Sequence, residues 1–269
     1  MTTVEVRLST PTRLPEALGL PVDAIGIGQE GCLTKLPDTD ALLDAFAAIR
    51  ATGRDAVLVS PIAWPRTAGT LVARVRAVAE GGPLTVVVND LGTLLTLAGD
   101  RPAGCRLVVG LGLTRARPHS GDLSASAPPG AVVDTALLDE LAGHGIDGVE
   151  VDVLTDVSSV DGGWQVRQVV DAVPVAYARS CPTARHHRTG PPDCRELCET
   201  SYTITPRQRW RLDHGHLEPL PAGAAGPRLT VWGNAVYQSS DVSPHADHLI
   251  IDARRHAAGE LAARIAAAA

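Results

Sequence analysis

Short apolar runs rich in β-branched residues alternate with amphipathic segments along most of the chain, and this alternation constrains the fold more than any other feature of the sequence. Seven runs come first, at 4–9, 23–28, 55–62, 84–90, 105–113, 148–154 and 173–180, and two more follow at 229–234 and 248–253. Strands that are apolar almost throughout and alternate with helices are typical of a parallel sheet covered on both faces. We therefore expect an α/β protein.

The segments between the runs have the pattern of amphipathic helices. The expected helices cover 41–53, 70–82, 91–99 and 135–145, and each stretch ends in the glycine that commonly follows a helix. This number of strand and helix pairs favours a TIM-like (β/α) barrel over an open doubly wound sheet. We predict a single barrel domain over residues 1–269, with an irregular cysteine-bearing loop after about the seventh strand and a closing helix over 254–269.

Composition supports a globular protein and limits the classes of partner to expect. The 269 residues are 45% hydrophobic, which is enough for a large core. A formal net charge of −6 gives no general attraction to nucleic acids or anionic membranes. The amino terminus has no basic region followed by an apolar run, and no apolar segment is long enough to span a bilayer. We expect a cytoplasmic protein, in which thiols stay reduced.

Four of the five cysteines are candidates for one metal centre. Cys181, Cys194 and Cys198 lie in a short segment that contains glycine and proline, and Cys32 directly follows the second apolar run. Cys194 and Cys198 are one helical turn apart and could face one centre. In a parallel barrel the carboxyl ends of the strands converge on one face, so loops after the second and seventh strands can meet there.

Three interpretations of these cysteines remain open. Structural zinc sites usually show two closely spaced ligand pairs, which Cys32 does not fit, although His186 or His187 could contribute. An iron–sulfur cluster is commonly bound by four cysteine thiolates at scattered spacings. The four could also be unrelated buried thiols. For Cys105, which begins an apolar strand, a buried structural thiol is the better interpretation.

Other motifs carry less weight. The glycines of 26–31 follow a strand in the order of a dinucleotide-binding motif, but that motif requires a helix to open within the glycines. Here the helix is expected only after Asp38 or Asp40, so the glycines more simply leave space at a strand end. The sequence contains no nucleophile elbow, Walker loop or zinc-protease helix.

The cysteine segment also resembles a known family. The stretch AYARSCPTARHHR at 176–188, followed by Cys194 and Cys198, and Cys32 followed by Lys35, are similar to peptidase family U32. Within that family the likeness is greatest to iron–sulfur members that act in ubiquinone biosynthesis. The stretches VVVNDLG at 86–92 and VWGNAVYQSSD at 231–241 also look like family segments. The resemblance covers most of the chain in outline, and the cysteine pattern is its specific part.

The resemblance implies a barrel that carries a 4Fe–4S cluster on four cysteines, namely Cys32, Cys181, Cys194 and Cys198. It implies a component of an oxygen-independent hydroxylase, with prephenate as oxygen donor and a second U32-family subunit as partner in a heterodimer. We expect a small aromatic or secondary-metabolite substrate. Two alternatives remain. The chain could be a non-catalytic cluster-bearing subunit that stabilises or passes electrons to an active partner, or it could be a peptidase.

Candidate catalytic residues lie near the cysteines and at strand ends. Lys35, Arg179 and Arg185 flank the thiols and could bind carboxylates, as arginine does in bidentate fashion, or they could be solvated loop charges. Asn89 and Asp90 end the run 84–90, and barrel enzymes place catalytic groups at such positions. Two further acidic residues, Glu150 and Asp152, lie in the run 148–154 near the expected strand end and are weaker candidates.

Overall fold

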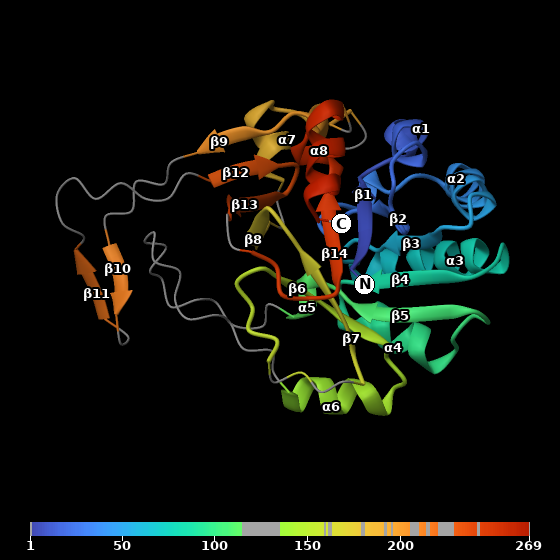
Figure 1. The fold of residues 1–269 in the computed structure, drawn as a ribbon. Helices are drawn as coiled ribbons and strands as arrows, with labels where there is room; N and C mark the ends of the chain where they lie inside the picture. The colour runs from blue at the N-terminus through green and yellow to red at the C-terminus, as the bar shows by residue number, and fades with distance from the viewer. Residues whose placement is uncertain are drawn as a thin grey trace.

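Eight parallel strands form a closed barrel in this computed structural model (Figure 1). It describes residues 2–114, 135–158, 160, 163–178, 181–190, 193–194, 196–204, 210–213, 216–219, 229–240 and 243–268. The barrel strands are β1 (Thr3–Leu8), β2 (Ala24–Gly28), β3 (Asp55–Val59), β4 (Leu84–Val88), β5 (Cys105–Val109), β6 (Gly148–Asp152), β7 (Gln165–Val169) and β14 (His248–Asp252). Strand β14 closes the barrel between β7 and β1, which confirms the predicted barrel class.

Helices cover the outside of the barrel and end close to where the sequence predicts. They are α1 (Leu14–Leu18), α2 (Thr39–Ala51), α3 (Pro65–Glu80), α4 (Leu91–Gly99), α5 (Leu111–Thr114), α6 (Thr135–Gly143) and α8 (Ala258–Ala268). Helix α2 begins at Asp38, whose carboxylate accepts a hydrogen bond from the amide of Ala41 at 2.9 Å. No helix therefore begins within the glycines of 26–31, so this segment does not meet the structural requirement of a dinucleotide-binding site.

The two faces of the barrel strands differ in character. On β1, Val4, Val6 and Leu8 belong to the apolar cluster between barrel and helices, together with helix residues such as Phe46 and Ile49. This is the alternation that a strand imposes on its side chains. The other face of several strands carries small apolar side chains, and that of β1, β6 and β7 carries charged ones. No described helix is long and apolar enough to cross a membrane.

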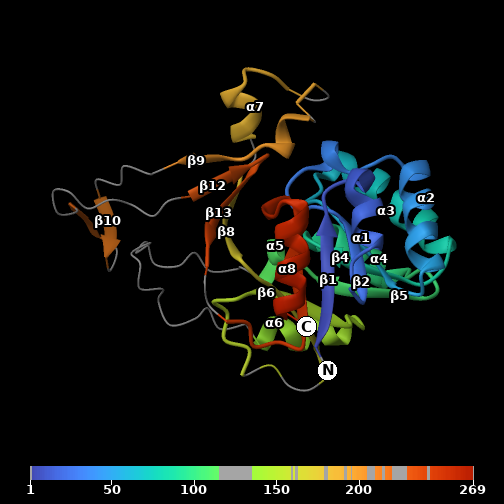
Figure 2. The same ribbon diagram turned by 45° about the horizontal axis from the view of Figure 1, so that its top comes forward.

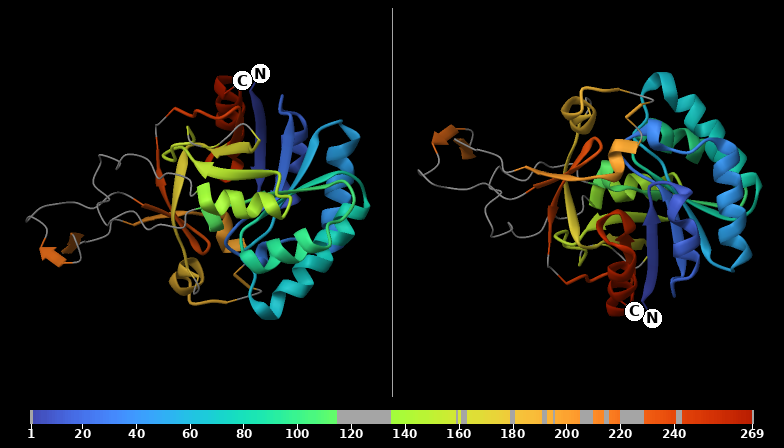
Figure 3. Two further views of the ribbon diagram at one scale, coloured as in Figure 1. Left: turned by 90° about the horizontal axis from the view of Figure 1, so that it is seen from below. Right: turned by 90° about the horizontal axis from the view of Figure 1, so that it is seen from above.

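A smaller antiparallel sheet interrupts the barrel between β7 and β14. Its strands are β8 (Ala172–Tyr177), β13 (Ala235–Ser239), β12 (Leu229–Trp232) and β9 (Tyr202–Ile204), in that order. It stands on the side of the barrel away from α2 and α3, with α7 (Pro182–His186) beside it (Figure 2). A separate hairpin pairs β10 (Trp210–Asp213) with β11 (His216–Pro219). Figure 3 shows the two chain ends side by side.

The prediction of the seventh and eighth barrel strands was partly wrong. The apolar runs at 173–180 and 229–234 form β8 and β12 of the small sheet rather than barrel strands. The seventh barrel strand is β7, which has polar residues at Gln165, Arg167 and Gln168 and so lacks an apolar pattern. Strand β8 contains Pro174, which cannot donate to a sheet ladder, and it lies at the edge of its sheet, where proline is tolerated.

Candidate functional site

One hairpin turn, between β12 and β13, joins the segments that carry the cysteines. The side chain of Asn234 in this turn donates hydrogen bonds to the carbonyl of Gly31 and, at 3.5 Å, to that of Ala178. The carbonyl of Asn234 accepts from the amide of Ala178 at 2.8 Å, and that of Gly233 accepts from the amide of Thr183 at 3.2 Å. The loop after β2, the end of β8 and the start of α7 are therefore fastened to a single turn.

Each thiol has a defined place around this turn. Cys32 precedes the short 3-10 helix η2 (Leu33–Lys35), and Cys181 caps α7 by accepting from the amide of Ala184 at 3.4 Å. The thiol of Cys198, in η3 (Glu196–Glu199), donates to the carbonyl of Cys194 at 3.6 Å. A Cβ atom added at Gly233 would lie 3.4 Å from the sulfur of Cys198, so the turn packs directly on this thiol.

Cys194 and Cys198 lie within electrostatic range of the other two thiols. Burial raises the pKa of the Cys198 thiol to about 11, and the nearby Cys181, Cys32 and Cys194 add to this effect, whereas Lys35 opposes it. Burial also raises the pKa of Cys194, again with Cys32 and Cys181 close enough to contribute. The thiol of Cys32, after the second strand, thus joins the three thiols of the much later cysteine segment in one group. No three or more His, Cys, Asp or Glu side chains within the described ranges are arranged to hold a single metal ion.

Cys105 is separate from this group, as its sequence context indicates. It opens β5, at the end of the barrel away from the cysteine loops, and it is buried in the apolar core. Burial raises its pKa to about 11, and the charges that act on it are Arg101 and Asp147 rather than the other cysteines.

The predicted basic residues have different environments. Lys35 is 8% exposed and lies at the end of η2, within electrostatic range of Cys198. Arg185 lies on α7 but is exposed. Arg179 falls outside the described residues. A role in binding carboxylates remains a prediction for all three.

Asn89 and Asp90 hold loops together at the mouth of the barrel. The amide nitrogen of Asn89 donates to the carbonyl of Ser60 at 2.8 Å, and its oxygen accepts from the amide of Gly112 at 2.9 Å. Asp90 caps α4 by accepting from the amide of Thr93 at 2.8 Å, and its other oxygen accepts from the loop after β3. These contacts give both residues a structural role, while a catalytic role remains untested.

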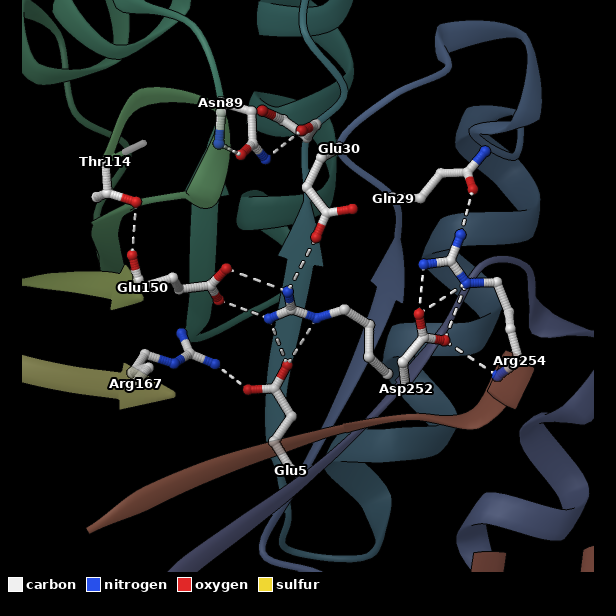
Figure 4. A network of polar contacts seen from close by, with 12 residues as sticks. Glu5, Gln29, Glu30, Asn89, Thr114, Glu150, Arg167, Asp252 and Arg254 are labelled. Carbon is white, nitrogen blue, oxygen red and sulfur yellow. Dashed lines mark hydrogen bonds and ion pairs between the residues drawn. The ribbon is translucent and has the colours of Figure 1, made fainter. Parts of the chain in front are cut away.

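A charged network inside the barrel was missed by the sequence analysis (Figure 4). Arg7 at its centre binds Glu150 through two hydrogen bonds of 2.5 and 3.1 Å, Glu5 at 2.9 Å and Glu30 at 3.4 Å. Arg167 of β7 binds the other oxygen of Glu5. Glutamates and arginines this deeply buried are rare unless they are paired. The bidentate contact between Arg7 and Glu150 is the strongest type of such a pair.

Mutual compensation keeps Glu5 and Arg7 ionised. Burial alone would raise the pKa of Glu5, but Arg167 and Arg7 outweigh it and hold that pKa well below the usual range. Burial would lower the pKa of Arg7, and Glu150 and Glu5 raise it instead. The signal that could have found the network is the alternation of charge within a strand, as at Glu5 and Arg7, because alternate positions of a barrel strand share one face.

A second polar cluster lies where the barrel meets the small sheet. Arg254, in η4 (Ala253–Arg255) after β14, binds both oxygens of Asp252 and donates to the amide oxygen of Gln29 at 2.8 Å. It also donates to the hydroxyl of Tyr237 at 3.3 Å. The guanidinium of Arg255 lies over the ring of Tyr237, with 4.6 Å between the Cζ atom and the ring centroid. This cluster joins the loops after β2 and β14 to the small sheet.

Fold and site together define a closed barrel of eight parallel strands with an inserted sheet whose hairpin turn gathers four thiols. Two solved structures are among those to which the chain is similar. For the U32 peptidase Mk0906 the TM-score is 0.44, with 15% identity over 94% of this chain and 92% of that one. For the 3-dehydroquinate dehydratase of Aquifex aeolicus VF5 it is 0.36, with 12% identity over 56% and 66%. No family model and no curated protein matches the chain.

Proposed function

We propose that Cys32, Cys181, Cys194 and Cys198 hold a 4Fe–4S cluster and that the chain is the iron–sulfur component of an oxygen-independent hydroxylase. The observation that carries the proposal is the grouping of these four thiols around one hairpin turn. In the sequence, most of the barrel strands lie between Cys32 and the other three cysteines.

The donor set suits such a cluster. Each of the four irons takes one thiolate, so the core suits sulfurs that surround a common space rather than a single point. Burial raises the pKa of Cys194 and Cys198, and a bound cation reverses that effect because it favours the thiolate, so loading would release protons. Lys35 offsets negative charge beside Cys198. When bound, the cluster would supply electron transfer.

The substrate and partner follow from the resemblance to U32-family hydroxylase components. We propose a small aromatic or secondary-metabolite substrate, prephenate as oxygen donor, and a related subunit as the second half of a heterodimer. Lys35 and Arg185 are the described basic residues nearest in sequence to the thiols, and both could bind an acidic group. The exposed position of Arg185 leaves it accessible to a ligand or partner.

The cofactor is tested by anaerobic purification, iron and sulfide analysis, and visible absorption. We expect about four irons per chain and a broad absorption band that bleaches on reduction. Cys194→Ser should abolish both, and Cys105→Ser, the matched control, should leave both unchanged. A colourless protein with stoichiometric zinc, or equal losses in the two variants, would contradict the assignment.

Activity distinguishes the remaining alternatives. Turnover of an aromatic substrate by the isolated, cluster-loaded chain would exclude a passive role. If turnover requires the partner subunit, and the partner alone retains it, this result would support the non-catalytic alternative. Peptide cleavage that persists in Cys194→Ser would instead identify a peptidase.

A further inference from the structure

Helix α7 ends in a turn that favours glycine, yet the residue there is an arginine. The amide of Thr189 donates to the carbonyl of Ala184 at 2.9 Å, and that of Arg188 donates to the carbonyl of Arg185 at 3.2 Å. These two bonds define a Schellman motif. Within it Arg188 has a φ of +54°, in the left-handed region that only glycine enters without strain. A strained residue of this kind points to a function of its side chain.

Arg188 completes a run of four exposed basic residues, the basic end of α7, which covers 185–188. Among the residues that the structure describes, none forms an ion pair with Arg185 or Arg188. The whole chain carries a formal net charge of −6, so this positive surface is a local one. Unpaired charge of one sign on a protein of the other sign is suited to steering a charged partner.

The basic end of α7 is held on the small sheet. The ring of His186 stacks on that of Tyr202 in β9, with 4.8 Å between the centroids and 21° between the planes. The ring of His187 meets that of His186 edge-on at 4.9 Å. Helix α7 stands clear of the barrel helices (Figure 2). The charges therefore have a fixed place that a partner can reach.

The opposite end of α7 carries one of the four thiols. Cys181 caps this helix, and at about 1.5 Å of rise per residue the basic end lies roughly 10 Å from it. Cys181 and Cys32 are half-buried, whereas Cys194 and Cys198 are buried. The side of the thiol group that comes nearest to the surface therefore includes the residue from which the basic helix starts.

We propose that the basic end of α7 is the docking surface for a small acidic electron-transfer protein. A long polyanion such as a nucleic acid fits less well, because the acidic chain as a whole repels it. On docking, the reduced carrier loses one electron and the cluster gains it, and no proton or covalent bond changes. This inference rests on the proposed function for the electron acceptor, but docking itself requires only the chain.

Docking is tested with a plant-type [2Fe–2S] ferredoxin, an acidic carrier, titrated by calorimetry into the anaerobically purified chain, whose iron is analysed in the same sample. Affinity should fall at least about tenfold between about 20 and 500 mM salt, because the screening length shortens from roughly 20 to roughly 4 Å. Cytochrome c, a basic carrier, should not bind.

Three variants locate the surface. Arg188→Glu should weaken ferredoxin at least about tenfold at low salt. The matched control Arg66→Glu makes the same change of charge at an exposed residue of α3, on the other side of the barrel, and should leave affinity unchanged. Arg188→Gly removes the charge and relieves the left-handed backbone, so affinity should fall while the melting temperature does not.

Electron delivery is measured by stopped flow, as bleaching of the visible band of the iron-loaded chain. Reduced ferredoxin should bleach Arg188→Glu at least about tenfold more slowly than the unchanged chain. Dithionite, which needs no docking surface, should bleach both equally.

Several results would overturn the proposal. They are no ferredoxin binding at low salt, equal binding of cytochrome c, tighter binding of polyuridylate than of ferredoxin, or equal effects of Arg188→Glu and Arg66→Glu. A chain that contains no iron would contradict the proposed function instead, because the binding measurements do not depend on the cluster.

Discussion

Replacing Arg7 by methionine should be among the most damaging single changes to this fold. Arg7 is buried and balances Glu5, Glu30 and Glu150 at 2.9, 3.4 and 2.5 Å. Methionine fills similar volume without charge, so the change leaves Glu150 as an uncompensated buried carboxylate. Removing one partner of a buried ion pair costs about 3–5 kcal/mol. We expect the free energy of unfolding to fall by about that amount, measured by urea denaturation at neutral pH.

The pH dependence gives a sharper test. In the native protein the pKa of Glu5 lies below its unfolded value, so the stability it provides is present above the unfolded pKa and disappears only in strong acid. In Arg7→Met one of the two arginines that hold down the pKa of Glu5 is gone, so part of this stability is lost. The deficit of the variant should therefore be present at neutral pH and shrink as pH falls through the unfolded pKa of Glu5.

The double variant Arg7→Met with Glu150→Gln is the matched control, because it removes the unpaired charge along with its partner. It should recover part of the lost stability, which a double-mutant cycle measures directly. A loss below about 1 kcal/mol for Arg7→Met, the range of exposed ion pairs, with no pH dependence, would refute the interpretation of a dry, mutually compensated network.

Two further predictions concern the thiol group and the barrel wall. Asn234→Ala removes the side-chain bonds to Gly31 and Ala178, so Cys32 should be alkylated severalfold faster in native protein, with Cys105 unchanged as internal reference by mass spectrometry. Gly28→Ala would place a Cβ atom 2.1 Å from the carbonyl of Val59 at a φ of +118°, and should lower the free energy of unfolding by well over 1 kcal/mol. The control Gly69→Ala, in helix α3 with open space around it, should raise that free energy by up to about 1 kcal/mol. Equal effects of the two glycine changes in thermal unfolding would contradict the steric argument.

Local pattern was enough to predict most of the barrel. Strands such as β4, with five buried residues, carry their assignment in their own composition, and the helix boundary at Asp38 is visible as a capping residue. Strand β7 could not be recognised in this way. Its Arg167 is stable inside the barrel only because Glu5, at the other end of the chain, binds it, and a partner so distant in sequence leaves no local trace.

The candidate site, too, could be predicted from the sequence only in part. That Cys32 could meet the three later cysteines followed from barrel topology. The turn that brings them together did not, because it depends on a contact between Asn234 and Gly31 across most of the chain.

Strand β14 pairs with β1 through residues such as Thr3 and His248, and it comes after the inserted sheet in the chain. Contacts between positions so far apart carry a large loop-closure cost and are associated with slow folding. During synthesis the amino-terminal strands and the cysteine-bearing insertion leave the ribosome before β14. Until β14 follows, the edges of β1 and β7 with which it pairs are open. The nascent protein must therefore shield these open strand edges. Its dependence on chaperones during expression should follow how readily β14 pairs.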